Sequence, residues 1–186
     1  TSSSTSNTPS STSNRCNRLF NSSFEIFMSD LGSCPEGCQI EGVNYCNPPI
    51  NLLFYPKECV PYWDILNSTT IEIWKSYEVL DFPAFQGDYF VELGGSEEQS
   101  SKALYQTFDV NIGDNYQVQF AHRGRVNFDN RLRVGLSGST SGIVLFPEEY
   151  VGLTTKWVFN TIDFTASESE YNLILSATTS SDGGNF

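Results

Sequence analysis

The segment Tyr116-Gln117-Val118-Gln119-Phe120 alternates apolar and amide side chains without a break. In an extended chain successive side chains point to opposite faces, so its three apolar residues share one face and its two glutamines share the other. The same period of two recurs in Arg131-Leu132-Arg133-Val134-Gly135-Leu136. This alternation is typical of strands that have one face in a core and the other in water. It predicts a protein built of β-sheets.

Eight further segments have the length and composition of short strands, and turn-forming residues separate them. The strands are expected at residues 24–28, 51–55, 70–74, 89–93, 104–110, 143–146, 157–164 and 171–177. The clearest turn signals lie at residues 111–115, 138–142 and 182–184. No stretch combines a sustained 3.6-residue apolar period with helix caps. About ten short strands in one domain predict an all-β fold, a two-sheet β-sandwich or jelly roll.

Composition favours an extracellular module. The 186 residues suffice for one domain with a good core, and 14% of them are aromatic while only 17% are charged. The net charge of -12 repels phosphate backbones and anionic lipids, so neither a nucleic-acid partner nor membrane insertion is expected. No run approaches the ~20 apolar residues that span a bilayer. We therefore expect a secreted protein at the cell surface.

The first thirteen residues are almost all polar, and eleven of them are Ser or Thr. Such a segment cannot bury apolar surface, so residues 1–14 are expected to form a linker or stalk before a sandwich domain at 15–186. The candidates for O-glycosylation in it are Thr1, Thr5, Thr8 and Thr12. Two N-glycosylation sequons follow, at Asn21 and Asn67. Covalent glycans are therefore expected.

The five cysteines all lie in the first third of the chain: Cys16, Cys34, Cys38, Cys46 and Cys59. Zinc binding is the alternative to disulfides, but paired C-x-x-C knuckles and histidine partners are missing. Disulfides formed in an oxidising compartment fit better. The last four cysteines allow three pairings, and the sequence does not choose between them. Cys16 is left over, either free or joined to a partner outside this chain.

No catalytic motif is recognisable, so the chain is not expected to be an enzyme. His122 is the only histidine, and a G-x-S-x-G nucleophile elbow is absent. The segment Gly138–Gly142 has Thr at its centre and is predicted to be a loop. Metalloprotease, P-loop and dinucleotide-binding motifs are absent too. Paired carboxylates for glycoside cleavage are the remaining catalytic alternative, although none of the 22 acidic residues is singled out.

A basic cluster is the clearest polar candidate for ligand binding, and it comprises His122, Arg123, Arg125, Arg131 and Arg133. Arg123 and Arg125 are two positions apart, and so are Arg131 and Arg133, so the two arginines of each pair share one face of a strand. Guanidinium groups bind carboxylates, sulfates or sugar hydroxyls. The alternative, which we favour, is ion pairing with Asp or Glu of neighbouring strands, or packing within the fold.

Flat aromatic side chains can stack on sugar rings, and four are candidates: Trp63, Trp74, Tyr77 and Trp157. Trp63 and Trp157 lie in apolar segments and are expected in the core. Trp74 and Tyr77 end a strand, where exposure is more plausible than for the other two, but core or rim packing is the interpretation we favour for both. Glu25 is a candidate ligand for a structural calcium ion, but no D-x-D-x-D-G cluster accompanies it. No other cofactor is expected.

Several short motifs, taken in order, resemble a known superfamily. They are Asn21-Ser-Ser-Phe-Glu25, similar to N-G-S-F-E; Ile71–Trp74, similar to I-E-V-W; Gly87–Leu93, similar to G-x-x-F-V-E-L; Leu104–Gln106 (L-Y-Q); Phe120–Arg125 (F-A-H-R-G-R); and Gly184–Phe186, the start of G-N-F-L-D. On these residues the chain resembles galactose-binding-like jelly-roll modules of bacterial cell-surface proteins. That superfamily includes plant cell-wall proteins of a domain-of-unknown-function group and many carbohydrate-binding modules.

The resemblance implies a jelly-roll fold, extracellular display and a polysaccharide or glycoconjugate partner, so we expect a non-catalytic module for adhesion or carbohydrate binding. The Cys-rich stretch 34–59 is an insert. In relatives the chain continues after G-N-F into a final strand, which this sequence lacks. The alternative is a structural subunit of a surface filament, in which copies complement each other's missing strand. A strip of core that includes Phe24, Ile26 and Leu173 would then be exposed.

Overall fold

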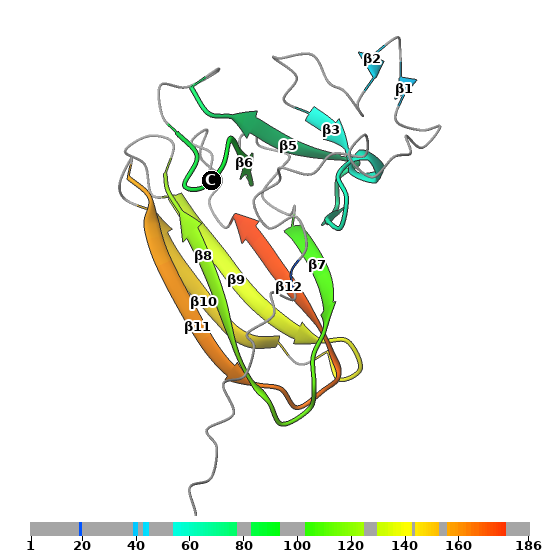
Figure 1. The fold of residues 1–186 in the computed structure, drawn as a ribbon, viewed down its shortest axis with the longest axis vertical. Coiled ribbons are helices and arrows are strands. Elements are labelled where there is room, and N and C mark those ends of the chain that lie inside the picture. The colour runs from blue at the N-terminus through cyan, green and yellow to red at the C-terminus, as the bar shows by residue number, and fades with distance from the viewer. Residues whose placement is uncertain are drawn as a thin grey trace, which may run out of the picture.

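The structure, a computed structural model, describes residues 19, 39–40, 43–44, 54–77, 83–93, 103–124, 130–142, 144–152 and 156–177 (Figure 1). Within these ranges the strands are β1 (Gln39–Ile40), β2 (Val43–Asn44), β3 (Phe54–Pro56), β4 (Asp64–Leu66), β5 (Thr70–Lys75), β6 (Tyr89–Glu92), β7 (Ala103–Asp109), β8 (Asn115–His122), β9 (Asn130–Gly138), β10 (Val144–Gly152), β11 (Val158–Thr165) and β12 (Glu170–Ala177). A single 3₁₀ turn, η3 (Lys57–Cys59), joins β3 to the loop before β4. The predicted all-β fold is confirmed.

The strands pair antiparallel in four sheets. The largest has the order β10-β9-β12-β7-β4, and the others are β11-β8, β3-β5-β6 and the small pair β1-β2. Figure 1 shows β8 and β11 running alongside β9 and β10, with β3, β5 and β6 gathered above them. One core cluster contains side chains from the three larger sheets. The five-stranded sheet is therefore one layer of a sandwich, and the β11-β8 and β3-β5-β6 sheets form the other.

The alternation seen in the sequence decides which side chains enter this core. On β9, Leu132, Val134 and Leu136 are buried while Arg133 between them is exposed. On β8, Val118 is buried and the glutamines on either side of it are exposed. Removing one such aliphatic side chain from water is worth roughly 1.5–3 kcal/mol. The core thus forms from the period of two.

Two glycines close turns that the sequence predicted. Gly113 (φ 87°) lies in the β7–β8 turn and donates its amide hydrogen to the carbonyl of Ala166 at 2.8 Å. Gly142 (φ 64°) lies in the β9–β10 turn and donates to the carbonyl of Gly138 at 2.9 Å. Residues other than glycine rarely adopt these positive φ angles. The segment 138–142 is a loop, as expected.

The predicted strands that fall among the described residues are present, with two kinds of difference. The sequence did not predict β1, β2 or β4, because two or three residues are too few for a periodic signal. Strand β10 continues well beyond the predicted segment 143–146, through Pro147. Its register with β9 shifts between Leu145 and Glu148, and β10 lies at the edge of its sheet. Proline has no amide hydrogen to donate to a neighbouring strand. It is tolerated at a sheet edge or a register shift, because no such hydrogen bond is needed there.

The described strands do not support the filament expectation. Strand β12 pairs with β7 on one side and β9 on the other, so it has no open edge. Leu173, which was expected in an exposed strip of core, is buried. The expected exposure of Leu173 was wrong, because both strands that pair with β12 belong to the same chain. Phe24 and Ile26, like the expected strand 24–28 and turn 182–184, lie outside the described residues.

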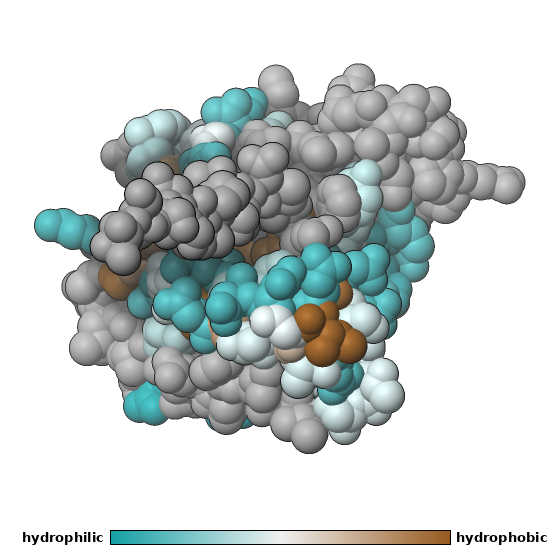
Figure 2. Space-filling view, turned by 60° about the horizontal axis from the view of Figure 1, so that its bottom comes forward, coloured by the Kyte–Doolittle hydropathy of each residue, from teal (hydrophilic) through white to brown (hydrophobic). Residues whose placement is uncertain are grey.

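Cys59 is fully buried and disulfide-bonded. Its partner lies outside the described residues, as do Cys16, Cys34, Cys38 and Cys46, so the described residues do not choose among the three pairings. No cluster of three or more metal-binding side chains occurs in the described ranges. No helix among the described residues is long and apolar enough to cross a membrane. Among the described residues coloured in Figure 2, hydrophobic colour is confined to small areas beside hydrophilic ones, so these residues form no broad apolar surface on that face.

Candidate functional site

A hollow of about 480 Å³ opens beside the short edge strand β4 and its neighbour β7. Its lining residues come from η3, the loop before β4, the first residue of β4, and β7: Lys57, Glu58, Tyr62, Trp63, Asp64, Tyr105, Gln106 and Thr107. The volume falls within the range of small-molecule sites in proteins. We call this feature the β4–β7 hollow.

The loop that forms one wall of the hollow is held in an unusual conformation. Tyr62 has a positive φ of 71°, which a non-glycine residue adopts only where its surroundings impose it. The Gln106 side-chain amide donates to the Tyr62 carbonyl at 3.1 Å, which ties the loop to β7. The Tyr62 ring is 48% exposed, whereas Trp63 beside it is buried. The loop therefore presents the Tyr62 ring to the hollow, and the hydrogen bond from Gln106 holds the loop backbone beneath it in place.

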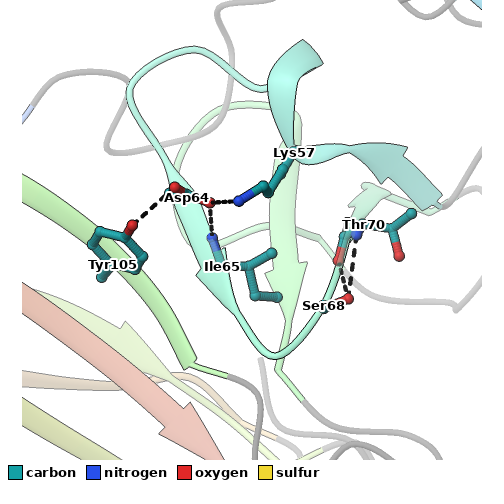
Figure 3. Close-up of polar contacts among 6 residues, drawn as sticks. All are labelled: Lys57, Asp64, Ile65, Ser68, Thr70 and Tyr105. Atoms are coloured by element: carbon teal, nitrogen blue, oxygen red, sulfur yellow. Dashed lines mark hydrogen bonds and ion pairs between the residues drawn. The ribbon is translucent and has the colours of Figure 1, made fainter. Parts of the chain in front are cut away.

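Asp64 is the centre of a polar network in the hollow (Figure 3). Lys57 Nζ lies 2.8 Å from its Oδ1, and the Ile65 amide donates to the same oxygen at 2.7 Å. The Tyr105 hydroxyl donates to Oδ2 at 2.8 Å. Asp64 and Tyr105 are directly opposite each other in the β4–β7 pairing. The network thus joins η3, β4 and β7 through one carboxylate.

These contacts set the protonation states. For Asp64, burial is the largest single effect and raises the pKa, but the hydrogen bonds from Lys57, Tyr105 and the Ile65 amide, with the Lys57 charge, outweigh it and lower the pKa below its ordinary value. The hydrogen bond to Asp64 raises the pKa of Tyr105, and burial adds to this. The hydrogen bond to Asp64 also raises the pKa of Lys57. Near neutral pH the hollow therefore holds a carboxylate, an ammonium and a protonated phenol.

The turn after β4 is closed locally. The Ser68 hydroxyl donates to the Thr70 carbonyl at 3.0 Å and accepts from the Thr70 amide at 3.2 Å (Figure 3). Asn67, the second predicted N-glycosylation site, is exposed in this turn with φ 57°. Its position leaves it accessible, and its modification stays a prediction. Asn21, Glu25 and the four candidate threonines of the linker lie outside the described residues.

The structure does not bring the predicted basic residues together. His122 and Arg123, at the end of β8, are both buried. Arg131 and Arg133 lie on β9, which belongs to the other layer, with their side chains on its outer face. Arg125 lies outside the described residues. The prediction of one basic patch was therefore wrong for the described members, because strands that follow each other in the chain were assigned to one surface when they belong to opposite sheets.

His122 and Arg123 have packing contacts. The His122 ring lies 6.3 Å from the Phe120 ring and 5.8 Å from the Tyr150 ring, centroid to centroid, and its Nδ1 is 3.0 Å from Nδ2 of Asn160. The Arg123 guanidinium lies over the Trp157 ring at 5.7 Å, and burial lowers its pKa. Arg133 on β9 lies opposite Glu149 of the neighbouring strand β10. Packing within the fold thus describes His122 and Arg123 better than ligand binding does.

The aromatic candidates are sorted by tertiary packing. Trp63 is buried, as expected, and Tyr77 is 64% exposed. Trp74 is buried against Phe90, so it cannot serve as an exposed platform. Trp157, expected in the core, is only partly buried and packs at the edge of the same small cluster. The burial of Trp74 agrees with the packing that we favoured for it, because β5 ends inside the cluster. The core expectation for Trp157 was wrong, because β11 begins at the rim of that cluster.

Sequence reasoning missed most of the hollow. Lys57, Asp64 and Tyr105 form its network, yet no motif joins them, and Asp64 and Tyr105 are 41 positions apart. The one local signal was the segment Pro61-Tyr62-Trp63-Asp64, in which two aromatic residues precede an acid between strands. Such a pattern is compatible with a binding loop, but only the pairing of β4 with β7 shows what it faces.

No protein-family model matches the chain, and no curated protein matches it either. Among solved structures, the N-terminal CBM22-1–CBM22-2 tandem domain of Paenibacillus barcinonensis Xyn10C is similar, with 12% identity and a TM-score of 0.50; the match covers 72% of this chain and 41% of that one. TmCBM61, solved with beta-1,4-galactotriose, has 16% identity and a TM-score of 0.48, covering 68% and 83%. A family 35 carbohydrate binding module from Clostridium thermocellum has 18% identity and a TM-score of 0.42, covering 72% and 91%.

At these identities the likeness shows the fold alone. The match to the tandem domain, together with the two-layer arrangement of antiparallel sheets, agrees with the sequence resemblance. The chain has a β-sandwich fold similar to that of this tandem domain.

Proposed function

We propose that this chain is a non-catalytic extracellular module that binds carbohydrate in the β4–β7 hollow. The observation that carries the proposal is the half-exposed Tyr62 ring, held beside the fixed network of Lys57, Asp64 and Tyr105. A sugar presents an apolar ring face and a rim of hydroxyl groups. An aromatic ring suits the face, and charged or amide groups suit the hydroxyls.

The lining supplies both kinds of hydroxyl partner. Lys57 has three amine hydrogens, of which the Asp64 contact uses one. Asp64 accepts hydrogen bonds, and the Thr107 hydroxyl, which also lines the hollow, donates to Asn172 at 2.6 Å, so its oxygen is oriented. Because these partners are fixed before a ligand arrives, little ordering free energy is lost on binding.

The same network supports binding over catalysis. A glycosidase needs a carboxylic acid whose pKa is raised so that it can protonate the leaving oxygen. The pKa of Asp64 is lowered, since hydrogen bonds from Lys57, Tyr105 and Ile65 outweigh the effect of burial. A carboxylate held ionised beside an ammonium is suited to accepting a hydrogen bond from a hydroxyl. The Ser/Thr-rich linker and the sequons support a role in adhesion at a cell surface. The fold shared with the CBM22-1–CBM22-2 tandem domain supports the ligand class.

The test is binding of the isolated chain to an array of neutral polysaccharides, followed by titration calorimetry with the best one. Tyr62→Ala removes the stacking face and is expected to raise Kd by up to about tenfold, since aromatic contacts contribute about 0.5–1.5 kcal/mol beyond the area they bury and 1.4 kcal/mol is a factor of ten. Tyr77→Ala, which removes an exposed tyrosine that does not line the hollow, is the matched control. Equal loss in both variants, or no binding to any glycan, would refute the proposal.

A further inference from the structure

A second group of exposed aromatic rings lies away from the hollow, where β11 begins. Phe85 and Phe159 are each 51% exposed, and their rings stack with centroids 5.8 Å apart and planes inclined by 15°. Trp157 meets the edge of Phe85 at 6.2 Å. We call these three residues the Phe85–Phe159 platform. The planes of the Phe85 and Phe159 rings are nearly parallel, and both residues are open to solvent.

The loop that carries Phe85 is fastened to its surroundings on both sides. Trp157 Nε1 donates to the Pro83 carbonyl at 2.9 Å, and the Ala84 amide donates to the Ser76 hydroxyl at 2.8 Å. The Ser76 amide in turn donates to the Asp88 carbonyl at 2.7 Å. Phe85 is therefore held in place by a hydrogen-bonded loop between β5 and β6.

The platform also has a supported underside. The Phe90 ring meets Trp157 edge-on at 5.9 Å, and Trp74 packs behind Phe90 at 6.4 Å. The buried Arg123 guanidinium lies over the Trp157 ring at 5.7 Å, a favourable cation–π arrangement. These contacts fix Trp157, and Trp157 fixes Phe85. The rings are thus positioned before any ligand binds.

A row of polar side chains continues the platform along the outer face of the β8–β11 sheet. Phe159, Thr161 and Asp163 alternate with inward residues on β11, and the register places Gln119 opposite Thr161 and Gln117 opposite Asp163. The Gln119 amide donates to Gln117 at 2.6 Å, and the Gln117 amide donates to Asp163 at 2.9 Å. This chain of hydrogen bonds orients both amides. An aromatic ring is thus followed, about 6.6 Å further along the strand, by aligned hydrogen-bonding groups.

We propose that the outer face of the β8–β11 sheet is a second carbohydrate-binding surface, which stacks a pyranose ring of a neutral glycan on Phe85 and Phe159 and binds its hydroxyls through Thr161 and Gln119. Phe159 points away from the core on one layer, and Tyr105 of the hollow points away from it on the other. The two surfaces therefore face apart, and one chain can bind two glycan strands. The inference rests on the proposed function only in its ligand class, because the residues are different.

Charge and polarity argue for a neutral sugar over a second copy of this chain. Each copy carries a net charge of -12, so two copies repel each other, and an acidic glycan is repelled in the same way. A stable protein interface needs about 800 Å² per partner with a mostly apolar centre. Here the aromatic rings are bordered by Thr161, Asp163 and two glutamines, all exposed. A single sugar ring needs only the small platform and its polar border.

The experiment compares the whole chain with three variants on an array of immobilised neutral galactans, xylans, glucans and mannans. Phe85→Ala with Phe159→Ala removes the platform, Tyr62→Ala removes the ring of the hollow, and Ile112→Ala truncates an apolar side chain that is more exposed than these rings and lies in the distant β7–β8 turn. We expect the platform variant to lose tenfold or more in apparent affinity for at least one glycan that Tyr62→Ala still binds. The Ile112 variant should bind all glycans as the unmodified chain does.

Each outcome is decisive. Unchanged binding by the platform variant, with loss in Tyr62→Ala, overturns the second surface and leaves the proposed function standing. Loss in the platform variant alone overturns the hollow and supports the platform. A dimer in light scattering that the platform variant disperses overturns the inference in favour of self-association. A thermal melt of the platform variant checks that it still folds. Because Phe85 and Phe159 are half-exposed, their replacement should change Tm by only a few degrees.

Discussion

Replacing Tyr105 by Phe tests the network of the β4–β7 hollow with one atom removed. The ring stays in the β7 surface, while the 2.8 Å hydrogen bond to Asp64 is lost. Hydrogen bonds to charged groups are worth about 1.5–3 kcal/mol. The Asp64 side chain is 40% exposed, so solvent weakens the contact and we expect a loss of about 1 kcal/mol. For a chain of this length that is a fall in Tm of about 2–4 °C.

The pH dependence has a definite sign. The pKa of Asp64 is lowered in the folded state because hydrogen bonds from Lys57, Tyr105 and Ile65 outweigh the raising effect of burial. Its stabilising contribution is therefore full above the ordinary aspartate pKa of about 3.9 and is lost as pH falls through the lower folded value. The difference in Tm between the Tyr105→Phe variant and the unmodified chain should be largest near pH 7 and shrink toward pH 2.

Two measurements check this reasoning. Thermal denaturation followed by circular dichroism at several pH values gives the difference in Tm, and carboxyl ¹³C NMR titration gives the pKa of Asp64, which should rise in Tyr105→Phe. Tyr77→Phe removes the hydroxyl of an exposed tyrosine outside the hollow and should change neither quantity. A Tm deficit that is the same at pH 2 and pH 7, or an Asp64 pKa that stays unchanged in Tyr105→Phe, would refute the network.

Three further predictions concern stability. Leu104→Ala empties a fully buried position of the core and should lower the free energy of unfolding by about 2–5 kcal/mol in urea titration; a loss below 1 kcal/mol would contradict the assigned core. Gly142→Ala meets no atom within 4 Å but sits at φ 64°, so backbone strain alone should cost about 1 kcal/mol; an equally stable variant would mean that the turn relaxes. Trp157→Phe loses the 2.9 Å hydrogen bond to the Pro83 carbonyl and should cost about 1 kcal/mol, with faster proteolysis in the adjoining loop; unchanged cleavage there would show that the loop is held by other contacts.

The hollow and the platform differ in how they can fail. In the hollow, one ring lies beside charges, so both Tyr62→Ala and neutralisation of Lys57 by methionine should weaken binding. On the platform the rings are bordered by neutral amides and Asp163, so replacing Lys57 should leave binding there unchanged. Titrations of Lys57→Met beside the platform variant therefore separate the contributions of the two surfaces.

The sequence by itself determined the fold class and the strands of the core. Alternation is a local property of the chain, and each apolar residue of Tyr116–Phe120 or Arg131–Leu136 faces inward whatever its neighbours are. The glycine turns at 113 and 142 were readable for the same reason, since a positive φ is a requirement on one residue. The burial of Trp63 was predicted too, because it lies within an apolar run.

Only the tertiary structure decided which surface side chains meet. Strands β8 and β9 are successive in the chain but belong to different sheets, so the arginines of the expected patch are separated. Asp64 and Tyr105 are joined by pairing across 41 positions, and no local pattern encodes that pairing. Exposure of one aromatic ring and burial of another likewise depend on where a strand ends relative to its neighbours. Side-chain direction is a local property of the backbone, whereas proximity depends on the packing of distant segments, and a binding site needs both.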